Sequence, residues 1–251
     1  MQQANTLDFA GVSAHDALPA TEIAKAGHDE AAALATAERG RFLDVLETLD
    51  EADWQQPTDC TLWTVHGVVA HQAGSLEAFS SFANFRRHRS KEVIQSYLDR
   101  GMSELDASNQ AQVDLRAGRT PAEMIAEIRQ RGPEAIAYRK GLPALVRAIR
   151  LPDPDSGKWM SVGYLTDIIL VRDMWSHRLD VCRATGREFV QTPAHDGRIL
   201  AIVVRELAQQ LRAVLGLRSV VYELRGTSGG CWRMGSNSRA PARQTTRSAQ
   251  P

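Results

Sequence analysis

Arg172-Asp-Met-Trp-Ser-His177-Arg-Leu-Asp180 lies within a predicted helix that runs from about residue 161 to 185. Gly186 ends this helix, since a residue in the left-handed conformation often terminates helices at this position. Asp173 and His177 are four residues apart and therefore project from the same helix face, with Asp180 on that side as well. A long amphipathic helix with polar groups gathered on one face favours a helical bundle with an internal site.

Two interpretations of the Asp173–His177 pair remain open. A carboxylate and an imidazole at this spacing can reach one divalent ion, since zinc binds imidazole nitrogen at about 2.0–2.1 Å and carboxylate oxygen at about 2.0–2.2 Å. The helix fixes both groups before the ion arrives, which lowers the cost of ordering them. The alternative is an ordinary ion pair on a solvated or half-buried helix face.

His71 is a third candidate ligand, on a helix predicted after Trp63. The apolar face of that helix comprises Val65, Val68, Val69, Gln72, Leu76 and Phe79. His71 instead shares a stripe of small residues with Gly67 and Gly74. Glycine inside a helix costs about 1 kcal/mol relative to alanine, so this stripe suggests either room for a ligand or a close approach of another helix. A packed histidine at a tight helix crossing is the alternative.

The remaining chain predicts a mainly α fold. Helices are expected over residues 21–50, from Thr120, where Glu123 completes a capping box, and from Thr192. Residues 219–225 and 231–234 are predicted strands joined by a turn. We therefore expect a bundle of about four helices, then a fifth helix and a small αβ module that stops early.

Four segments follow from this pattern. Residues 1–20 are expected to form a flexible arm. Residues 21–190 should form the helical bundle and 191–235 a helix with a β-hairpin. Residues 236–251 contain no apolar side chain larger than alanine and are expected to be disordered.

Composition excludes several classes of protein. The 251 residues include 30 Lys and Arg against 30 Asp and Glu, so a broadly basic nucleic-acid binder is not expected. We expect no membrane span, because the apolar runs are far shorter than the ~20 residues that a bilayer requires, and no signal peptide. Cys60, Cys182 and Cys231 form no CxxC pair, which favours a reducing cytoplasm over a disulfide framework.

Other polar residues carry less information. Cys60 precedes the second helix and could be a nucleophile at a helix N-terminus, but no base can be assigned to it, and a buried structural thiol is the alternative. Surface positions are expected for His15, His28, His66, His88 and His195. The sequence contains no nucleophile-elbow, P-loop or dinucleotide-binding motif.

Three segments together resemble a known family. They are AERGRFLDVLETLDEADWQQPTDC (37–60), LWTVHGVVAHQAGSLEAF (62–79) and DMWSHRLDVCRATGR (173–187). The motifs W-x7-H and D-x3-H-R-x-D are similar to those of the DinB-like superfamily, and within it of the mycothiol-dependent maleylpyruvate isomerases of actinobacteria. The resemblance covers roughly residues 28–235.

The resemblance implies a DinB-like four-helix bundle that holds a divalent metal, usually zinc, on His71, Asp173 and His177. It also implies a C-terminal αβ domain similar to sterol carrier proteins. In the isomerase that domain contributes an arginine to the site, for which Arg225 is the nearest candidate here. This sequence has the shorter Asp173 where the isomerase has glutamate, and Gly67 where relatives often have an acid.

The implied function is an enzyme that uses mycothiol or a similar thiol. The metal-bound thiolate would attack a small electrophile or unsaturated acid, as an isomerase or as an S-transferase. Asp180 would orient a metal-bound histidine, and Arg178 or Arg225 would meet a substrate carboxylate. The alternative is a non-catalytic bundle that binds a ligand or a partner. A monomer or a homodimer is expected.

Overall fold

The computed structural model describes residues 17–152, 157–236 and 242–246, the last five by their backbone alone. It consists of two compact units, each with its own hydrophobic core. One unit is Gly27–Phe189, and the other joins residues 17–26 to the described residues after 189. The predicted boundary at residue 21 therefore differs from the observed one, because residues 21–26 pack with the second unit.

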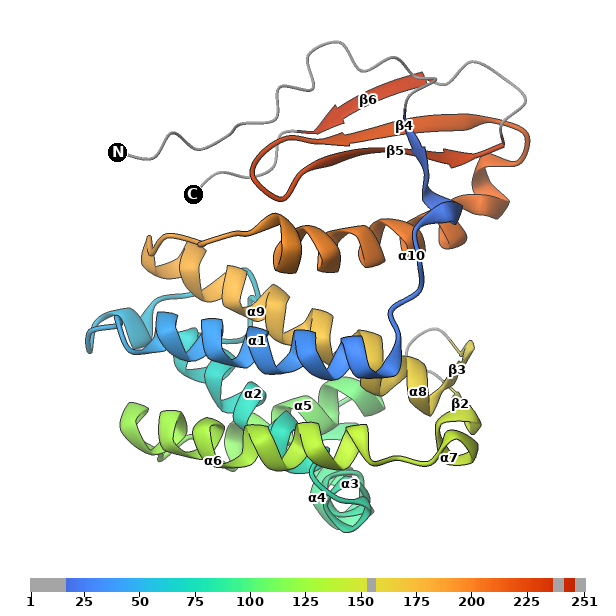
Figure 1. The fold of residues 1–251 in the computed structure, drawn as a ribbon. Helices are drawn as coiled ribbons and strands as arrows, with labels where there is room; N and C mark the ends of the chain where they lie inside the picture. Colours follow the sequence, from blue (N-terminus) through green and yellow to red (C-terminus); the bar gives the residue numbers. More distant parts are fainter. Residues whose placement is uncertain (1–16, 153–156, 237–241, 247–251) are drawn as a thin grey trace. The chain divides into compact units, whose positions relative to one another are not determined.

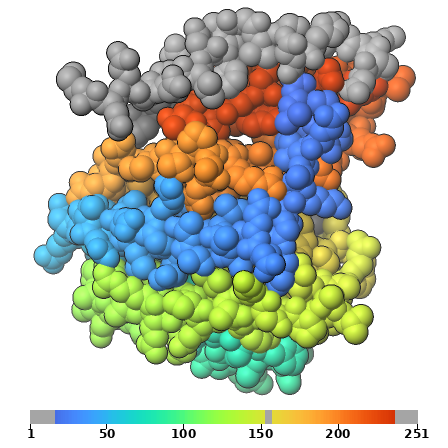
Figure 2. All heavy atoms as spheres, viewed as in Figure 1, coloured from blue at the N-terminus to red at the C-terminus, as the bar shows by residue number. Residues whose placement is uncertain are grey.

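The larger unit is a bundle of four long helices (Figure 1): α1 (His28–Leu46), α2 (Val65–Ala78), α6 (Pro121–Lys140) and α9 (Leu170–Thr185). Helix α1 packs against α6 and α9, and α2 packs against the same two helices, so the four close a ring. Figure 2 shows the side chains of α1 and α6 in direct contact. The enclosed core includes Phe42, Leu46, Val65, Val68, Val69, Met124, Ile128 and Val181.

The ends of the long helices follow from local sequence. The Thr120 side chain accepts a hydrogen bond from the Glu123 backbone, and the Glu123 carboxylate accepts one from the Thr120 backbone, which confirms the capping box of α6. Helix α6 continues through Pro133, because Ile128 and Ala135 on either side of it are completely buried. Helix α9 ends at Gly186, whose φ of +65° confirms the predicted left-handed terminator.

Shorter elements connect the bundle helices. Between α2 and α6 lie α3 (Phe82–His88), α4 (Lys91–Leu98) and α5 (Glu104–Asp114), and α5 packs directly on α2. Between α6 and α9 lie α7 (Ala144–Ala148), the hairpin β2 (Arg150–Pro152) with β3 (Trp159–Ser161), and α8 (Val162–Tyr164). A wide π-helical turn, Leu165–Ile169, joins α8 to α9.

The second unit is a sheet covered by α10 (Arg198–Leu215) (Figure 1). Strands β4 (Ser219–Leu224) and β5 (Gly230–Gly235) form the predicted antiparallel hairpin. The sheet is larger than expected, because β1 (Leu18–Pro19) pairs with β5 and β6 (Ala242–Thr246) pairs with β4, both in parallel. Its core includes Ala20, Ile23, Val204, Ala208, Trp232 and Met234.

Several expectations change in detail. The first long helix begins at His28 rather than residue 21, because residues 20–22 form a separate turn that packs against α10 and β5. Of the predicted flexible arm (1–20), only residues 17–20 are among the described residues. Of the predicted disordered tail (236–251), only Ser236 and strand β6 are described. None of the described helices combines the length and apolar character that a bilayer-spanning helix needs.

Candidate metal centre

The three predicted ligands lie together inside the bundle. His71 projects from α2, and Asp173 and His177 project from α9, with their ligand atoms within 4.8 Å of one another. The Nε2 atom of His71 is 3.5 Å from Asp173 Oδ2, and the Nε2 atom of His177 is 3.5 Å from Asp173 Oδ1. Both imidazoles are buried, whereas the Asp173 side chain is 31% exposed. The two histidines therefore face one partly accessible carboxylate.

A second polar group holds each of these side chains. The Nδ1 atom of His71 lies 2.9 Å from Gln112 Oε1, and the Nδ1 atom of His177 lies 2.9 Å from Asp180 Oδ2. Both acceptors favour the tautomer with hydrogen on Nδ1, which leaves the Nε2 lone pairs directed at the site. The Gln72 amide donates to Asp173 Oδ2 at 2.7 Å and fixes that carboxylate.

The two glycines of α2 make room for these neighbours. A Cβ atom on Gly74 would lie 2.5 Å from the Cβ atom of Gln112, so glycine lets α5 approach closely enough for Gln112 to reach His71. A Cβ atom on Gly67 would lie 2.9 Å from the Cβ atom of Trp63, whose ring stacks on the His71 ring with centroids 5.1 Å apart. The glycine stripe thus marks a tight helix crossing that also builds the site.

Electrostatics of the site favour an ionised carboxylate. Burial raises the pKa of Asp173, but the close approach and charge of His71, the charge of His177 and the hydrogen bond from Gln72 hold it well below its usual range. Burial lowers the pKa of His177, but the hydrogen bonds to Asp180 and Cys60 and the charge of Asp173 outweigh it and raise the pKa to about 10. A cation bound here would replace that imidazolium proton.

A pocket of about 130 Å³ opens onto His71 and Asp173. We call it the His71 pocket. Its apolar wall comprises Phe79, Phe85, Leu105, Leu165, Ile169 and Leu170. Its polar lining includes Ser75, His88, Arg89, Ser108 and Asn109. An apolar cleft with a few polar groups beside perturbed titratable residues is typical of a small-molecule site.

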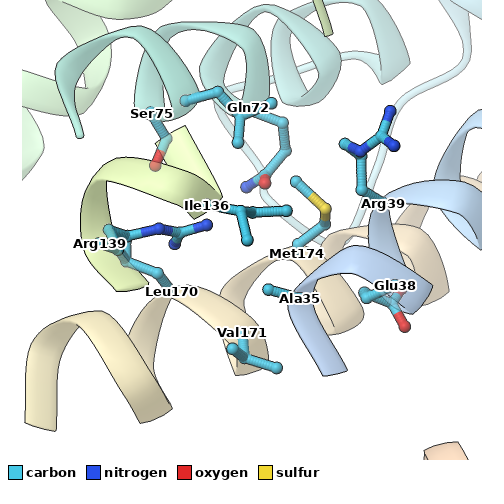
Figure 3. A pocket seen from close by; sticks show the side chains of 11 residues that line it. Ala35, Glu38, Arg39, Gln72, Ser75, Ile136, Arg139, Leu170, Val171 and Met174 are labelled. Carbon is cyan, nitrogen blue, oxygen red and sulfur yellow. The ribbon is translucent and has the colours of Figure 1, made fainter. Parts of the chain in front are cut away.

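A separate small cavity lies behind Gln72 (Figure 3). Side chains from all four bundle helices line it, among them Ala35, Gln72, Ser75, Ile136, Arg139 and Met174. Burial lowers the pKa of Arg139 to about 10, which the charge of Asp167 partly opposes. The volume of about 10 Å³ is at the lower limit for one water molecule, so this cavity cannot take a substrate.

Cys60 lies closer to the site than the sequence indicated. Its Sγ atom is 3.6 Å from Asp180 Oδ2 and 3.9 Å from His177 Nδ1, so Cys60, His177 and Asp180 form a second group of possible ligands. The Cys60 side chain is half-buried, so it is neither the fully buried structural thiol nor the freely exposed nucleophile. Sequence reasoning missed these neighbours because Asp180 and His177 are on a distant helix and no local pattern links them to Cys60.

Some predicted positions are wrong. Arg178 is completely buried and forms an ion pair with Glu38, so it cannot meet a substrate. His88 and His195 are buried rather than solvated. Arg225 lies in the second unit, as expected, where its Nε atom donates to Glu223 at 3.0 Å, and its role towards a substrate stays a prediction.

Comparisons with known proteins agree with this architecture. The family model described as the mycothiol maleylpyruvate isomerase N-terminal domain matches residues 34–182. Two solved structures, of the mycothiol-dependent maleylpyruvate isomerase and of one of its point mutants, are similar in fold. Each has a TM-score of 0.56 and covers 94% of this chain and 88% of its own, at 15% and 14% identity respectively. Among curated proteins there is no match. The chain therefore belongs to the family of the mycothiol maleylpyruvate isomerase N-terminal domain.

Proposed function

We propose that this protein is a metal-dependent enzyme that uses mycothiol or a similar small thiol to isomerise, or to add sulfur to, an electrophilic small molecule. Family membership and the shared fold support the class of enzyme. The geometry around His71, Asp173 and His177 supports the metal, for which zinc is the first candidate.

The separation of the ligand atoms carries this proposal. Two atoms bound at about 2.0–2.1 Å to one tetrahedral zinc ion lie about 3.3–3.4 Å apart. Both Nε2–Oδ separations here are 3.5 Å, which exceeds the usual 2.7–3.2 Å of a direct hydrogen bond. The two separations run to different oxygens of Asp173, so each oxygen lies near ligand spacing from one histidine, which supports an ion among the three side chains. Asp173 also lines the His71 pocket, where a fourth ligand would enter.

Each residue has a distinct task in this proposal. A bound divalent ion would lower the pKa of a coordinated thiol, so that the thiol is a nucleophile at neutral pH. Gln112 and Asp180 hold the two imidazoles with Nε2 free to bind, and Gln72 orients the carboxylate. The apolar wall of the His71 pocket would exclude water from the electrophile.

Metal analysis of purified protein tests the site. We expect about one zinc ion per chain, lost in His71→Ala and in His177→Ala. His66→Ala is the matched control, because His66 is on the same helix but bonds to the Arg119 carbonyl instead. Cys60→Ala distinguishes the two overlapping groups of possible ligands. The variant should keep its zinc if the ion is bound by Asp173, whereas loss of zinc would show that Cys60 and Asp180 bind it.

Activity forms the second test. Zinc-loaded protein should convert maleylpyruvate, or conjugate a related electrophile, only when mycothiol or another small thiol is present. A folded wild-type protein that takes up no metal after incubation with zinc would refute the proposal. The bundle would then be the non-catalytic ligand-binding or interaction protein that the sequence left as the alternative.

A further inference from the structure

Arg89 lines the same pocket as the candidate metal ligands. It caps the C-terminus of α3, and the His71 pocket runs from His71 and Asp173 to Arg89, Phe85 and His88. A small molecule in this pocket would therefore lie among both the candidate metal ligands and an arginine.

Arg89 places its guanidinium in the wall of this pocket. Among the residues that the structure describes, the guanidinium makes neither an ion pair nor a hydrogen bond, and its charge lies 5.1 Å from the centre of the Phe85 ring. Burial lowers the pKa of Arg89, and Glu104 opposes this only through its charge at longer range. Arginine stays charged in proteins, so the mainly apolar wall of the pocket holds a cation that forms no ion pair with the described residues.

His88 adds a second unsatisfied group in this pocket. Its side chain is 2% exposed, and its Nε2 atom lies 3.2 Å from a Glu77 carboxylate oxygen. Its Nδ1 atom is buried with no hydrogen-bond partner in the described part of the chain. Buried polar atoms are rarely left unpaired, and both His88 and Arg89 line the pocket, which indicates that a polar ligand completes it.

We propose that Arg89 binds the carboxylate of a small unsaturated acid, whose double bond then lies towards His71 and Asp173. This deepens the proposed function and rests on it for the reaction. The guanidinium can take both carboxylate oxygens, while Asn109 and Ser108 of α5 add polar groups to the same lining. Acid recognition would then belong to the helical bundle and not to Arg225 of the second unit.

Binding to metal-free protein tests this independently of zinc and of turnover. The probes are maleate and its neutral isostere maleamide, titrated by calorimetry. We expect maleate to bind more tightly than maleamide, and Arg89→Gln to weaken maleate about tenfold or more while leaving maleamide unchanged. Arg89→Lys keeps the charge without the planar fork and should give a smaller loss. Arg86→Gln is the matched control, since Arg86 is exposed on the same short helix.

The outcomes separate the two proposals. Equal maleate affinity in wild type and Arg89→Gln, or equal affinity of wild type for maleate and maleamide, overturns the assignment of Arg89. A loss confined to Arg225→Gln overturns it too and moves acid recognition to the second unit. In zinc-loaded protein, Arg89→Gln should raise the KM for the acid but not the KM for the thiol or the zinc content. Absence of zinc or of thiol-dependent turnover refutes the proposed function while the maleate titration still decides on Arg89.

Discussion

Gly74→Ala should weaken the candidate metal centre without touching a ligand. The added methyl group would lie 2.5 Å from the Cβ atom and 2.8 Å from the Cγ atom of Gln112. Carbon atoms pack best at about 3.5–4.0 Å, so Gln112 must retreat by about 1 Å. Its hydrogen bond to His71, now 2.9 Å, would then exceed the usual range. Losing such a partner typically lowers metal affinity about 10–100-fold.

Gly74→Ala should lower the free energy of unfolding, whereas replacing a helical glycine by alanine usually raises it. Overpacking costs about 1–3 kcal/mol, and the better helix propensity of alanine returns about 1 kcal/mol, so Gly74→Ala should lose about 0–2 kcal/mol. Gly40→Ala is the matched control, because Gly40 is inside α1 with nothing within 4 Å of the added methyl group. It should gain up to about 1 kcal/mol, which raises Tm by about 2–4 °C.

Scanning calorimetry and zinc competition against a chelator measure both effects. Gln112→Met removes the acceptor at similar size, so it should lower zinc affinity without the clash. The reasoning fails if Gly74→Ala melts as high as Gly40→Ala and keeps the zinc affinity of wild type.

Three further changes have defined outcomes. Asp180→Leu removes the acceptor for His177 and should lower zinc affinity about 10–100-fold in the same competition assay; unchanged affinity would count against the proposed ligand set. Glu38→Leu removes the carboxylate that pairs with the buried Arg178 and should cost about 3–5 kcal/mol in urea unfolding, whereas combining it with Arg178→Met should recover most of that loss. His88, Arg116 and Arg87 hold the pKa of Glu77 below its usual range. As pH falls, Glu77 therefore takes up a proton in the unfolded chain before it does so in the folded protein, so the free energy of unfolding should decline below about pH 4. The decline should be less steep in Glu77→Gln, which unfolding curves measured across pH would reveal.

Local sequence was sufficient for the elements that carry the site. The spacing of Asp173 and His177 predicted a shared helix face, and the structure places His71 opposite them. The capping box at Thr120 and the terminator at Gly186 needed only neighbouring residues, so both predictions were confirmed. These features depend on helix geometry, which the chain specifies within a few turns.

Features that depend on distant segments could not be predicted. Gln112 is 41 residues from its partner His71, and Arg178 is 140 residues from Glu38. No local pattern identifies such pairs, and Arg178 was a candidate to meet a substrate because charged side chains are seldom completely buried. Strand β1 is too short to show alternation, and β6 lies in a segment without large apolar side chains, so the sheet seemed to have only two strands.

The parallel pairing of Leu18–Pro19 with Trp232–Arg233 sets an order of events during synthesis. At about 5–20 residues per second, β1 leaves the ribosome roughly 10–40 s before its partner strand exists. The whole of Gly27–Phe189 is made in that interval, while Ala20 and Ile23 still lack the apolar surface that finally covers them. Closure of the second unit is therefore the last step of folding. A mutation at Ile23 and one at Trp232 should produce the same misfolded species, although the two residues are far apart in the sequence.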